Sequence, residues 1–330
     1  MPLFSTIIAT RNRPALFLSA LSSVVNQSCK SLEIIVVNDG SDEEHLAEYH
    51  RILGEAERPT QFHSLIRRPN GHGQSYALNF GVSQATGDYL CFLDDDDYWI
   101  DDSYLERVAA NIRSREIPPD LVFSNQAAFF GEQQKKGPIW LEGLATKLSR
   151  EHRRSDEDAF YEVSVDDLVN AGGFCHLNTM IVRSPLYNSA GGMDEGIRWE
   201  CDHDLFLRLI DRAGTMLLSP VAVSRHNIPD PAKAASITTS LNEVQRRLFQ
   251  LRVFEKASIF AASPEIRAHG RQHLGFTLKR IAQALVAAHD WSGAAYFGVL
   301  ALAAAPTLKW AGYTTYVALA RIRFGNGIQQ

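Results

Sequence analysis

The chain has 330 residues, of which 45% are hydrophobic and 22% charged, as expected for one large globular domain or a domain with an appendage. Its net charge of −5 argues against a nucleic-acid-binding protein. The charge is uneven, because eleven Lys and Arg against four acidic residues give +7 from Leu241 onward and leave −12 for the rest. An acidic body with a basic C-terminal part is therefore expected.

The four cysteines are widely spaced and form no Cys-x-x-Cys pair or metal-ligand spacing: Cys29, Cys91, Cys175 and Cys201. This pattern predicts reduced thiols in a cytoplasmic protein. The apolar N-terminal segment is followed, not preceded, by Arg11 and Arg13, and no small-residue cleavage site appears. We therefore expect a strand there rather than a signal peptide.

Up to Asp94, apolar runs of strand length alternate with segments of helical periodicity. Strands are expected at Leu3–Thr10, at Glu33–Asn38, more weakly at Phe62–Arg67, and in the run that ends at Asp94. Helices are expected at Ala15–Gln27, at Asp42–Leu53, and from the glycine-punctuated loop 70–73 to about Ala85. The alternation predicts a parallel α/β sheet with helices on both faces and ligands beyond the carboxyl ends of its strands.

The next part of the chain continues this pattern less regularly. After a helix that ends near Ile112, strands are expected at Leu121–Phe130, Asn178–Arg183 and Met216–Val223, with a helix over the apolar positions that follow Cys201. The polar stretch 131–158 predicts a mobile loop, and the segment 225–231, which holds two prolines, predicts a stiff turn.

Four consecutive carboxylates, Asp94–Asp97, follow an apolar strand and precede two aromatic residues. Like charges gathered at a strand end repel one another unless a cation neutralises them, and Mg²⁺ or Mn²⁺ suits clustered carboxylate oxygens and substrate phosphates. The alternative is a solvated acidic turn that also caps the following helix. The apolar strand before it and the aromatic pair after it favour a metal–phosphate site in a cleft.

Two other strand ends carry polar residues that should reach the same crevice, namely Thr10 with Arg11 and Asp39. The turn after the first strand, Arg-Asn-Arg-Pro, contains no glycine, so the dinucleotide-binding Gly-x-Gly-x-x-Gly pattern is absent. No Gly-x-x-x-x-Gly-Lys-Ser/Thr phosphate loop is present either. Hydride transfer and P-loop chemistry are thus disfavoured.

In order along the chain, several motifs together resemble the inverting family 2 glycosyltransferases, which have the GT-A fold. They are Thr-Arg-Asn-Arg-Pro (10–14), Val-Asn-Asp-Gly-Ser (37–41), Ala-Leu-Asn (77–79), Thr-Gly-Asp-Tyr-Leu (86–90) with the acidic run, and Asp-His-Asp-Leu (202–205). The resemblance covers about the first 230 residues. It implies a Rossmann-like, mostly parallel mixed sheet flanked by helices. Leu78 and Cys201 depart from the family pattern, which often has Arg and Glu there.

The resemblance implies a nucleotide-sugar donor bound by eight residues: Thr10, Arg11, Arg13, Asp39, Asn70, Asn79, Asp94 and Asp95. Asp39 would accept a hydrogen bond from N3–H of a pyrimidine, which favours a UDP- or dTDP-sugar because cytosine lacks that donor. Asp39 alone is equally well explained as a turn residue before Gly40. Asp94 or Asp95 would hold the ribose hydroxyls.

The resemblance further implies that Asp96, with His226 as a candidate ligand, binds Mn²⁺ or Mg²⁺ at the donor diphosphate. Asp202 would act as the single general base that inversion requires, with Glu200 as the alternative. The structural alternatives are a helix cap for Asp202 and a surface or core histidine for His226. Asp204 would be structural or contact the acceptor.

The function these residues predict is metal-dependent, inverting hexosyl transfer to a hydroxyl of a glycan or lipid-linked glycan, in polysaccharide biosynthesis. The alternative is a non-catalytic nucleotide-sugar-binding or scaffold protein of the same fold. Trp199 and His203 could line the acceptor site, although core packing explains Trp199 equally well.

The predicted domains are a GT-A domain at 1–232 and an α-helical extension at 233–330. Successive helices are expected at 240–262, 265–288, 292–304 and 308–323. The uncharged run 291–308 is about long enough to raise the question of a membrane span, but its Gly, Ser, Thr and Pro favour a packed helix. The basic side chains predict either contact with the inner face of the membrane or an ordinary solvated extension.

Overall fold

The computed structural model describes residues 2–135, 140–141, 143–151, 160–228 and 240–324. The chain divides into two compact units. The sheet unit comprises Met1–Gly196 with Cys201–Ile228, and the helical unit comprises Ile197–Glu200 with Pro229–Gln330. The predicted domain boundary at 232 lies outside the described residues.

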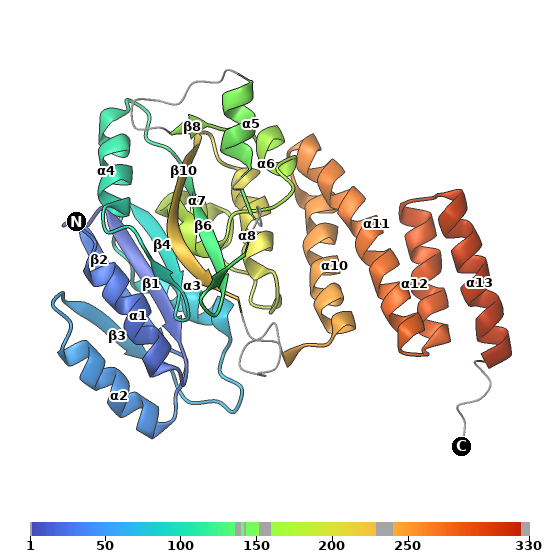
Figure 1. Cartoon of the computed structure of the whole chain (residues 1–330), viewed down its shortest axis with the longest axis horizontal. Coiled ribbons are helices and arrows are strands. Elements are labelled where there is room, and N and C mark those ends of the chain that lie inside the picture. Colours follow the sequence, from blue (N-terminus) through green and yellow to red (C-terminus); the bar gives the residue numbers. More distant parts are fainter. Residues whose placement is uncertain (1, 136–139, 142, 152–159, 229–239, 325–330) are drawn as a thin grey trace. The chain divides into compact units, whose positions relative to one another are not determined.

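A single ten-stranded mixed sheet organises the described part of the sheet unit (Figure 1), in the order β3-β2-β1-β4-β9-β6-β10-β5, with β7 beside β6 and β8 beside β10. The first four strands of that order are parallel, and β9 runs antiparallel to both β4 and β6. The strands are β1 (Phe4–Thr10), β2 (Leu32–Asn38), β3 (Thr60–Ser64), β4 (Tyr89–Asp94), β5 (Tyr98–Trp99), β6 (Leu121–Phe130), β7 (Gln133–Gln134), β8 (Tyr161–Glu162), β9 (Met180–Arg183) and β10 (Met216–Asn227).

Helices cover both faces of this sheet because the buried residues of its parallel strands alternate in direction. Ile34 and Val36 of β2 belong to a large core with α1, α2 and α4, whereas Ile35 and Val37 pack with Ala77 of α3. The helices of the unit are α1 (Pro14–Val25), α2 (Glu43–Gly54), α3 (Gln74–Gln84), α4 (Tyr104–Ser114), α5 (Leu144–Arg150), α6 (Val165–Val169), α7 (Ser184–Ser189) and α8 (Cys201–Ile210), with a 3₁₀ turn at Leu177–Thr179. The predicted α/β architecture is confirmed.

Four local predictions differ from the structure. The strand expected at Asn178–Arg183 begins at Met180, because Leu177–Thr179 form a 3₁₀ turn. The third strand spans Thr60–Ser64 rather than Phe62–Arg67, since pairing with β2 sets its ends. The predicted loop 131–158 contains β7 and α5, while its residues 136–139, 142 and 152–158 lie outside the described residues. The turn predicted at 225–231 was wrong for Arg225–Asn227, which continue β10 because they pair with β6.

The helical unit contains the four predicted helices, which are α10 (Glu243–Phe260), α11 (Pro264–Ala287), α12 (Trp291–Ala304) and α13 (Leu308–Phe324). Side chains cap three of their N-termini: Asn242 in a capping box, Ser263 before Pro264, and Asp290. Leu278, Ala282, Ala301 and Trp310 form a separate core. Among the described residues, no helix has the length and hydropathy needed to cross a membrane.

Candidate active site

The ends of three parallel strands meet at one edge of the sheet. Thr10 of β1 is in register with Asn38 of β2, and Ala9 is in register with Asp94 of β4. The backbone N–H of Asp39 donates to the carbonyl oxygen of Thr10 at 2.9 Å. The polar residues that follow these strands are thus neighbours, as the parallel topology predicts.

Asp95 is buried beneath this edge, with 1% of its side chain exposed. Thr10 Oγ1 donates to Asp95 Oδ2 at 2.6 Å, and the Arg13 guanidinium pairs with Asp95 and with Asp96, the latter at 2.9 Å. Burial raises the pKa of Asp95 to about 7, although the charge of Arg13 opposes the shift. Arg13 therefore neutralises part of the acidic run and Thr10 helps to position it, while the donor contacts expected of both residues stay predictions.

Asp97, whose side chain is fully buried, ties the acidic run to β10 and to the turn before β9. Its Oδ2 accepts from Asn178 Nδ2 at 2.5 Å and lies 2.6 Å from His226 Nδ1, and its Oδ1 accepts from the Asn227 N–H at 2.7 Å. Burial would lower the pKa of His226, but the hydrogen bond and charge of Asp97 raise it. His226 therefore lies next to the acidic run, which is the position that a metal ligand predicted from the sequence would need.

Asp94 and Asp96 remain partly exposed, at 21% and 27% of their side chains. Gln74 Nε2 donates to Asp94 Oδ1 at 2.7 Å, and the Asp94 N–H donates to Asn178 Oδ1 at 2.9 Å. Burial, and then the charges of Asp96 and Asp97, raise the pKa of Asp94. Such mutual repulsion is relieved by a cation.

Two groups of side chains in the described part of the chain have ligand atoms within 4.8 Å of one another: Asp94, Asp96 and Asp97, and Asp97, His176 and His226. Carboxylate oxygens with an imidazole fit Mn²⁺, and the carboxylates alone fit Mg²⁺. The donor set is therefore compatible with a divalent cation.

His176, which sequence reasoning missed, lies between the acidic run and Asp202. Its Nε2 is 3.7 Å from Asp94 Oδ2 and 3.9 Å from Asp202 Oδ2. Burial, and then the charge of His226, lower the pKa of His176 to about 4, so the ring is neutral at pH 7. Trp140 contacts both imidazoles edge-on, with ring centroids 5.8 Å from His176 and 5.1 Å from His226.

Asp202 occupies the first turn of α8, where backbone N–H groups stabilise a carboxylate. Its side chain is 16% exposed, and its Oδ1 accepts from the His203 N–H at 3.0 Å. The alternative base, Glu200, accepts from Gln250 of α10 at 2.9 Å within the helical unit. The ring of His203 stacks on Phe174, with centroids 4.3 Å apart.

Asp39 organises the loop that precedes α3. Its carboxylate accepts from the backbone N–H groups of His72 and Gly73 at 2.8–2.9 Å and lies 2.7 Å from His72 Nδ1. Arg11 donates to the carbonyl oxygens of Arg68 and Pro69 in the segment before that loop. These contacts hold the loop before α3 against the ends of β1 and β2.

Among the described residues, two others of the predicted donor site, Asn70 and Asn79, take no part in the hydrogen bonds of the acidic run. Asn70 is exposed at the tip of the loop. The Asn79 amide donates to the Met193 carbonyl and Glu195, and its oxygen accepts from the Met193 N–H and the Tyr187 hydroxyl. Asn79 therefore joins α3 to the segment after α7, and the donor contact expected of it stays a prediction.

The sequence model of glycosyl transferase family 2 matches residues 5–182, which span β1 to β9 and the acidic run. The chain belongs to glycosyl transferase family 2. The family assignment agrees with the resemblance found in the motifs.

Curated relatives in the family align over part of their length. A PGL/p-HBAD biosynthesis glycosyltransferase of Mycobacterium bovis is 37% identical over 127 residues, which cover 38% of this chain and 46% of that protein. The GalNAc(5)-diNAcBac-PP-undecaprenol beta-1,3-glucosyltransferase of Campylobacter jejuni is 36% identical over 99 residues, which cover 29% of this chain and 30% of the relative. The chain thus matches less than half the length of either relative.

Solved glycosyltransferases share the fold. S. aureus TarS 1-349 in complex with UDP-GlcNAc superposes with a TM-score of 0.66 at 17% identity, over 93% of this chain and 82% of that one. The mannosyltransferase PcManGT from Pyrobaculum calidifontis, in complex with GDP-Man and Mn²⁺, gives 0.53 at 18% identity, over 96% and 84%. The GT-A-type fold predicted from the sequence is confirmed.

Proposed function

We propose that this family 2 member transfers a sugar, with inversion, from a UDP- or dTDP-sugar to a hydroxyl of a glycan or lipid-linked glycan. The observation that carries the proposal is the approach of Asp94 and Asp202 to one imidazole nitrogen, His176 Nε2, at 3.7 and 3.9 Å. A candidate general base thereby stands beside the residues suited to a diphosphate and its cation, which is the arrangement that displacement at an anomeric carbon needs.

In this proposal Asp202 removes the proton of the acceptor hydroxyl as that oxygen attacks the sugar. Asp202 lies in the first turn of α8, where backbone N–H groups stabilise a carboxylate, and the ring of His176 is close to both Asp202 and Asp94. Asp94, Asp96 and Asp97 would hold Mn²⁺ or Mg²⁺, with His226 beside Asp97 as a further candidate ligand, and the cation would supply Lewis-acid stabilisation of the leaving diphosphate. Arg13 keeps Asp95 and Asp96 in place.

Substitution of the base tests this role. Asp202→Asn should retain nucleotide binding and reduce turnover by roughly 10²–10⁴-fold, because the amide cannot accept the proton. Glu200→Gln is the matched control, since that carboxylate contacts Gln250, and it should retain activity. Unimpaired turnover in Asp202→Asn, with loss in Glu200→Gln, would transfer the role of base to Glu200.

The pyrimidine preference rests on Asp39, which accepts hydrogen bonds at the end of β2. Thermal shifts with UDP-, dTDP-, GDP- and CMP-sugars, with and without Mn²⁺, measure it directly. We expect stabilisation by the UDP or dTDP compounds that increases with Mn²⁺. Stabilisation by GDP compounds alone would contradict the role of Asp39, and the GDP-Man complex of PcManGT makes this a real alternative.

The acceptor class is supported by the name of the C. jejuni relative, which acts on an undecaprenol-linked glycan. A cytoplasmic site is supported by four buried thiols that form no disulfide. The alternative is a non-catalytic binder of the same fold. Sugar-nucleotide binding without turnover on any hydroxyl acceptor, in a protein with Asp202 intact, would favour that alternative.

A further inference from the structure

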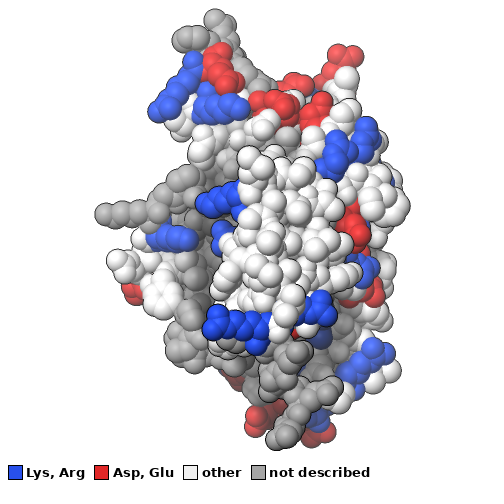
Figure 2. Space-filling view, turned by 90° about the vertical axis from the view of Figure 1, so that its right-hand side faces the viewer, with Lys and Arg blue, Asp and Glu red and all other residues white. Residues whose placement is uncertain are grey.

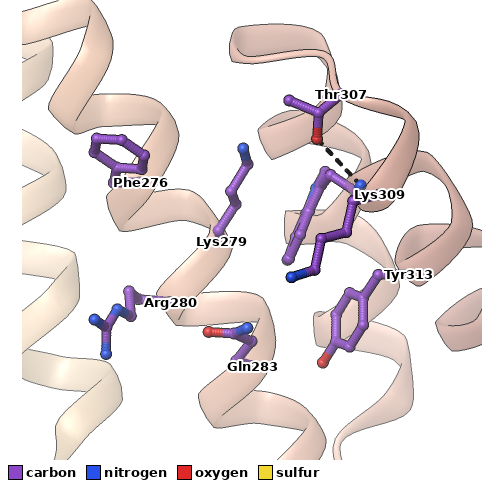
Figure 3. Close-up of a pocket in the computed structure, with 8 residues that line it drawn as sticks. Phe276, Lys279, Arg280, Gln283, Thr307, Lys309 and Tyr313 are labelled. Carbon is purple, nitrogen blue, oxygen red and sulfur yellow. Dashed lines mark hydrogen bonds between the residues drawn. The ribbon is translucent and has the colours of Figure 1, made fainter.

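A pocket of about 470 Å³ lies in the helical unit, far along the chain from the residues of the candidate active site. Figure 3 shows that α11 supplies one wall and the start of α13 the other. Three cations line it, Lys279, Arg280 and Lys309, together with Phe276, Gln283, Thr307, Trp310 and Tyr313. No carboxylate is among the lining residues, so the pocket suits an anion.

The aromatic walls are fixed more firmly than the cations. Trp310 is 7% exposed, and its indole N–H donates to the Gly298 carbonyl of α12 at 3.0 Å. The Lys279 ammonium lies 5.6 Å from the centroid of that ring. Within the described residues, no ion pair joins Lys279, Arg280 or Lys309 to an acidic side chain. Lys279 and Lys309 therefore lie beside a firmly held aromatic wall. Arg280 is turned away from that wall (Figure 3), and its charge helps to lower the pKa of Glu243 of α10.

Next to this pocket, α13 carries an apolar stripe on its exposed side. Leu308, Tyr316, Leu319 and Ile322 share one face of the helix by their spacing and are 95%, 56%, 61% and 72% exposed. Figure 2, which views the molecule from the side of α13, shows a broad uncharged surface with Lys and Arg side chains along much of its margin and a few Asp and Glu side chains beside them. Arg321 and Arg323 belong to the last turn of α13. An exposed apolar face with a basic border is typical of helices that lie in a membrane interface.

We propose that the helical unit binds the surface of a membrane that contains anionic lipids. The pocket takes the phosphate of one lipid headgroup, held by Lys279 and Lys309, and Arg280 at its margin adds positive charge. The apolar stripe of α13 enters the boundary between headgroups and acyl chains. This site is independent of the proposed sugar transfer, because no residue of the candidate active site contributes to it.

Charge complementarity favours a lipid surface over a second copy of the chain. From Leu241 onward the net charge is +7, and the last acidic residue is Asp290, ahead of the three cations Lys309, Arg321 and Arg323. Symmetric pairing through the stripe would bring like charges together, whereas an anionic surface attracts them. Because α13 ends in basic side chains next to its exposed apolar stripe, it suits an interfacial position.

Co-sedimentation of the full-length protein with vesicles tests the proposal. Vesicles of phosphatidylcholine with phosphatidylglycerol should bind the protein, and vesicles of phosphatidylcholine alone should not. Combined Lys279→Gln, Arg280→Gln and Lys309→Gln should weaken partitioning by on the order of 100-fold, roughly fivefold for each cation. Combined Lys30→Gln, Lys147→Gln and Arg150→Gln removes the same charges from exposed positions of the sheet unit and should change binding only a few-fold. Equal losses of vesicle binding in the two triple variants would contradict the proposed role of the pocket in binding the headgroup.

A second variant tests the apolar stripe without changing charge. Leu319→Gln with Ile322→Gln replaces two exposed side chains, so the fold should persist by circular dichroism, and vesicle binding should fall about tenfold or more. Retained vesicle binding would exclude insertion of the stripe into the membrane.

Inorganic diphosphate distinguishes a lipid headgroup from a free phosphate compound as the ligand of the pocket. If diphosphate stabilises the wild type more than the pocket triple variant, and anionic vesicles do not bind, the ligand is a free phosphate compound and the lipid proposal fails. Concentration-dependent self-association that Leu319→Gln with Ile322→Gln abolishes, without vesicle binding, would favour a second copy.

Discussion

At the scale of single residues, Arg13 illustrates how an active-site motif also holds the fold together. The sequence indicated a donor contact, and the structure pairs the guanidinium with Asp95 and Asp96. Removing one partner of a buried ion pair leaves an uncompensated charge, which costs more than the pair itself contributes. We therefore expect Arg13→Gln to destabilise the sheet unit by about 2–3 kcal/mol, less than a fully buried pair because one third of the Arg13 side chain is exposed.

Denaturant unfolding followed by tryptophan fluorescence measures this change. Arg51→Gln is the matched control, because Arg51 pairs with Glu48 and Glu55 on the exposed side of α2 and should matter little. If the two variants were equally stable, the Arg13–Asp95 pair would contribute nothing to folding, and a role in donor binding would become the better explanation.

The sequence predicted the position of the acidic run, but not which of its four carboxylates are buried and which are exposed. Periodicity gives the end of β4, yet only the packed structure distinguishes buried Asp95 and Asp97 from partly exposed Asp94 and Asp96. His176 was missed because it precedes β9, which runs antiparallel to β4, so that its start meets the end of β4. That direction cannot be read from local periodicity. A histidine and an amide two residues apart, directly before an apolar strand, were the available signal.

At the scale of elements, pairing between strands determined where β10 ends, which the intrinsic preferences of its residues did not predict. A turn was predicted at Arg225–Asn227 because prolines follow soon after. In the structure these residues pair with β6 and therefore continue β10. This extension brings His226 to Asp97. The parallel strands before Asp94 were easier to predict, since their apolar runs are buried on both faces.

The loop before α3 depends on Gly71. Its φ is +66°, and a Cβ added there would lie 2.4 Å from Asp39 Oδ2. Gly71→Ala should therefore cost on the order of 1–3 kcal/mol and displace the Asp39 carboxylate. If Asp39 receives the base of the donor, UDP binding should weaken about tenfold, as expected for the loss of a hydrogen bond to a charged group.

Isothermal titration of UDP into the variant measures this effect. Gly54→Ala is the control, because Gly54 ends α2 with a helical backbone and nothing within 4 Å of an added Cβ. Unchanged UDP affinity in Gly71→Ala, despite a loss of stability, would separate Asp39 from donor binding and leave it as the organiser of its loop.

At the scale of the whole molecule, the chain combines two kinds of packing. The sheet unit has a large core built from non-local strand contacts, and its fold could be predicted because strands and helices alternate over the first half of the chain. The helices of the other unit were also predictable, since Pro264, Asp290 and Pro306 mark their limits. The exposure of the apolar stripe on α13 was not, because the sequence does not show which face of a helix packs against its neighbours.

Separate cores predict separate unfolding. Leu278 is 6% exposed in the core of the helical unit, and Leu21 is 2% exposed in the core of the sheet unit. Each Leu→Ala change should cost about 2–5 kcal/mol through lost burial and the cavity left behind. Leu278→Ala should lower one calorimetric transition and leave UDP affinity unchanged, whereas Leu21→Ala should lower the other transition, the one that UDP shifts upward. A single transition that moves equally in both variants would show that the two cores unfold as one cooperative unit, and the helical unit would then be part of the framework that supports the donor site.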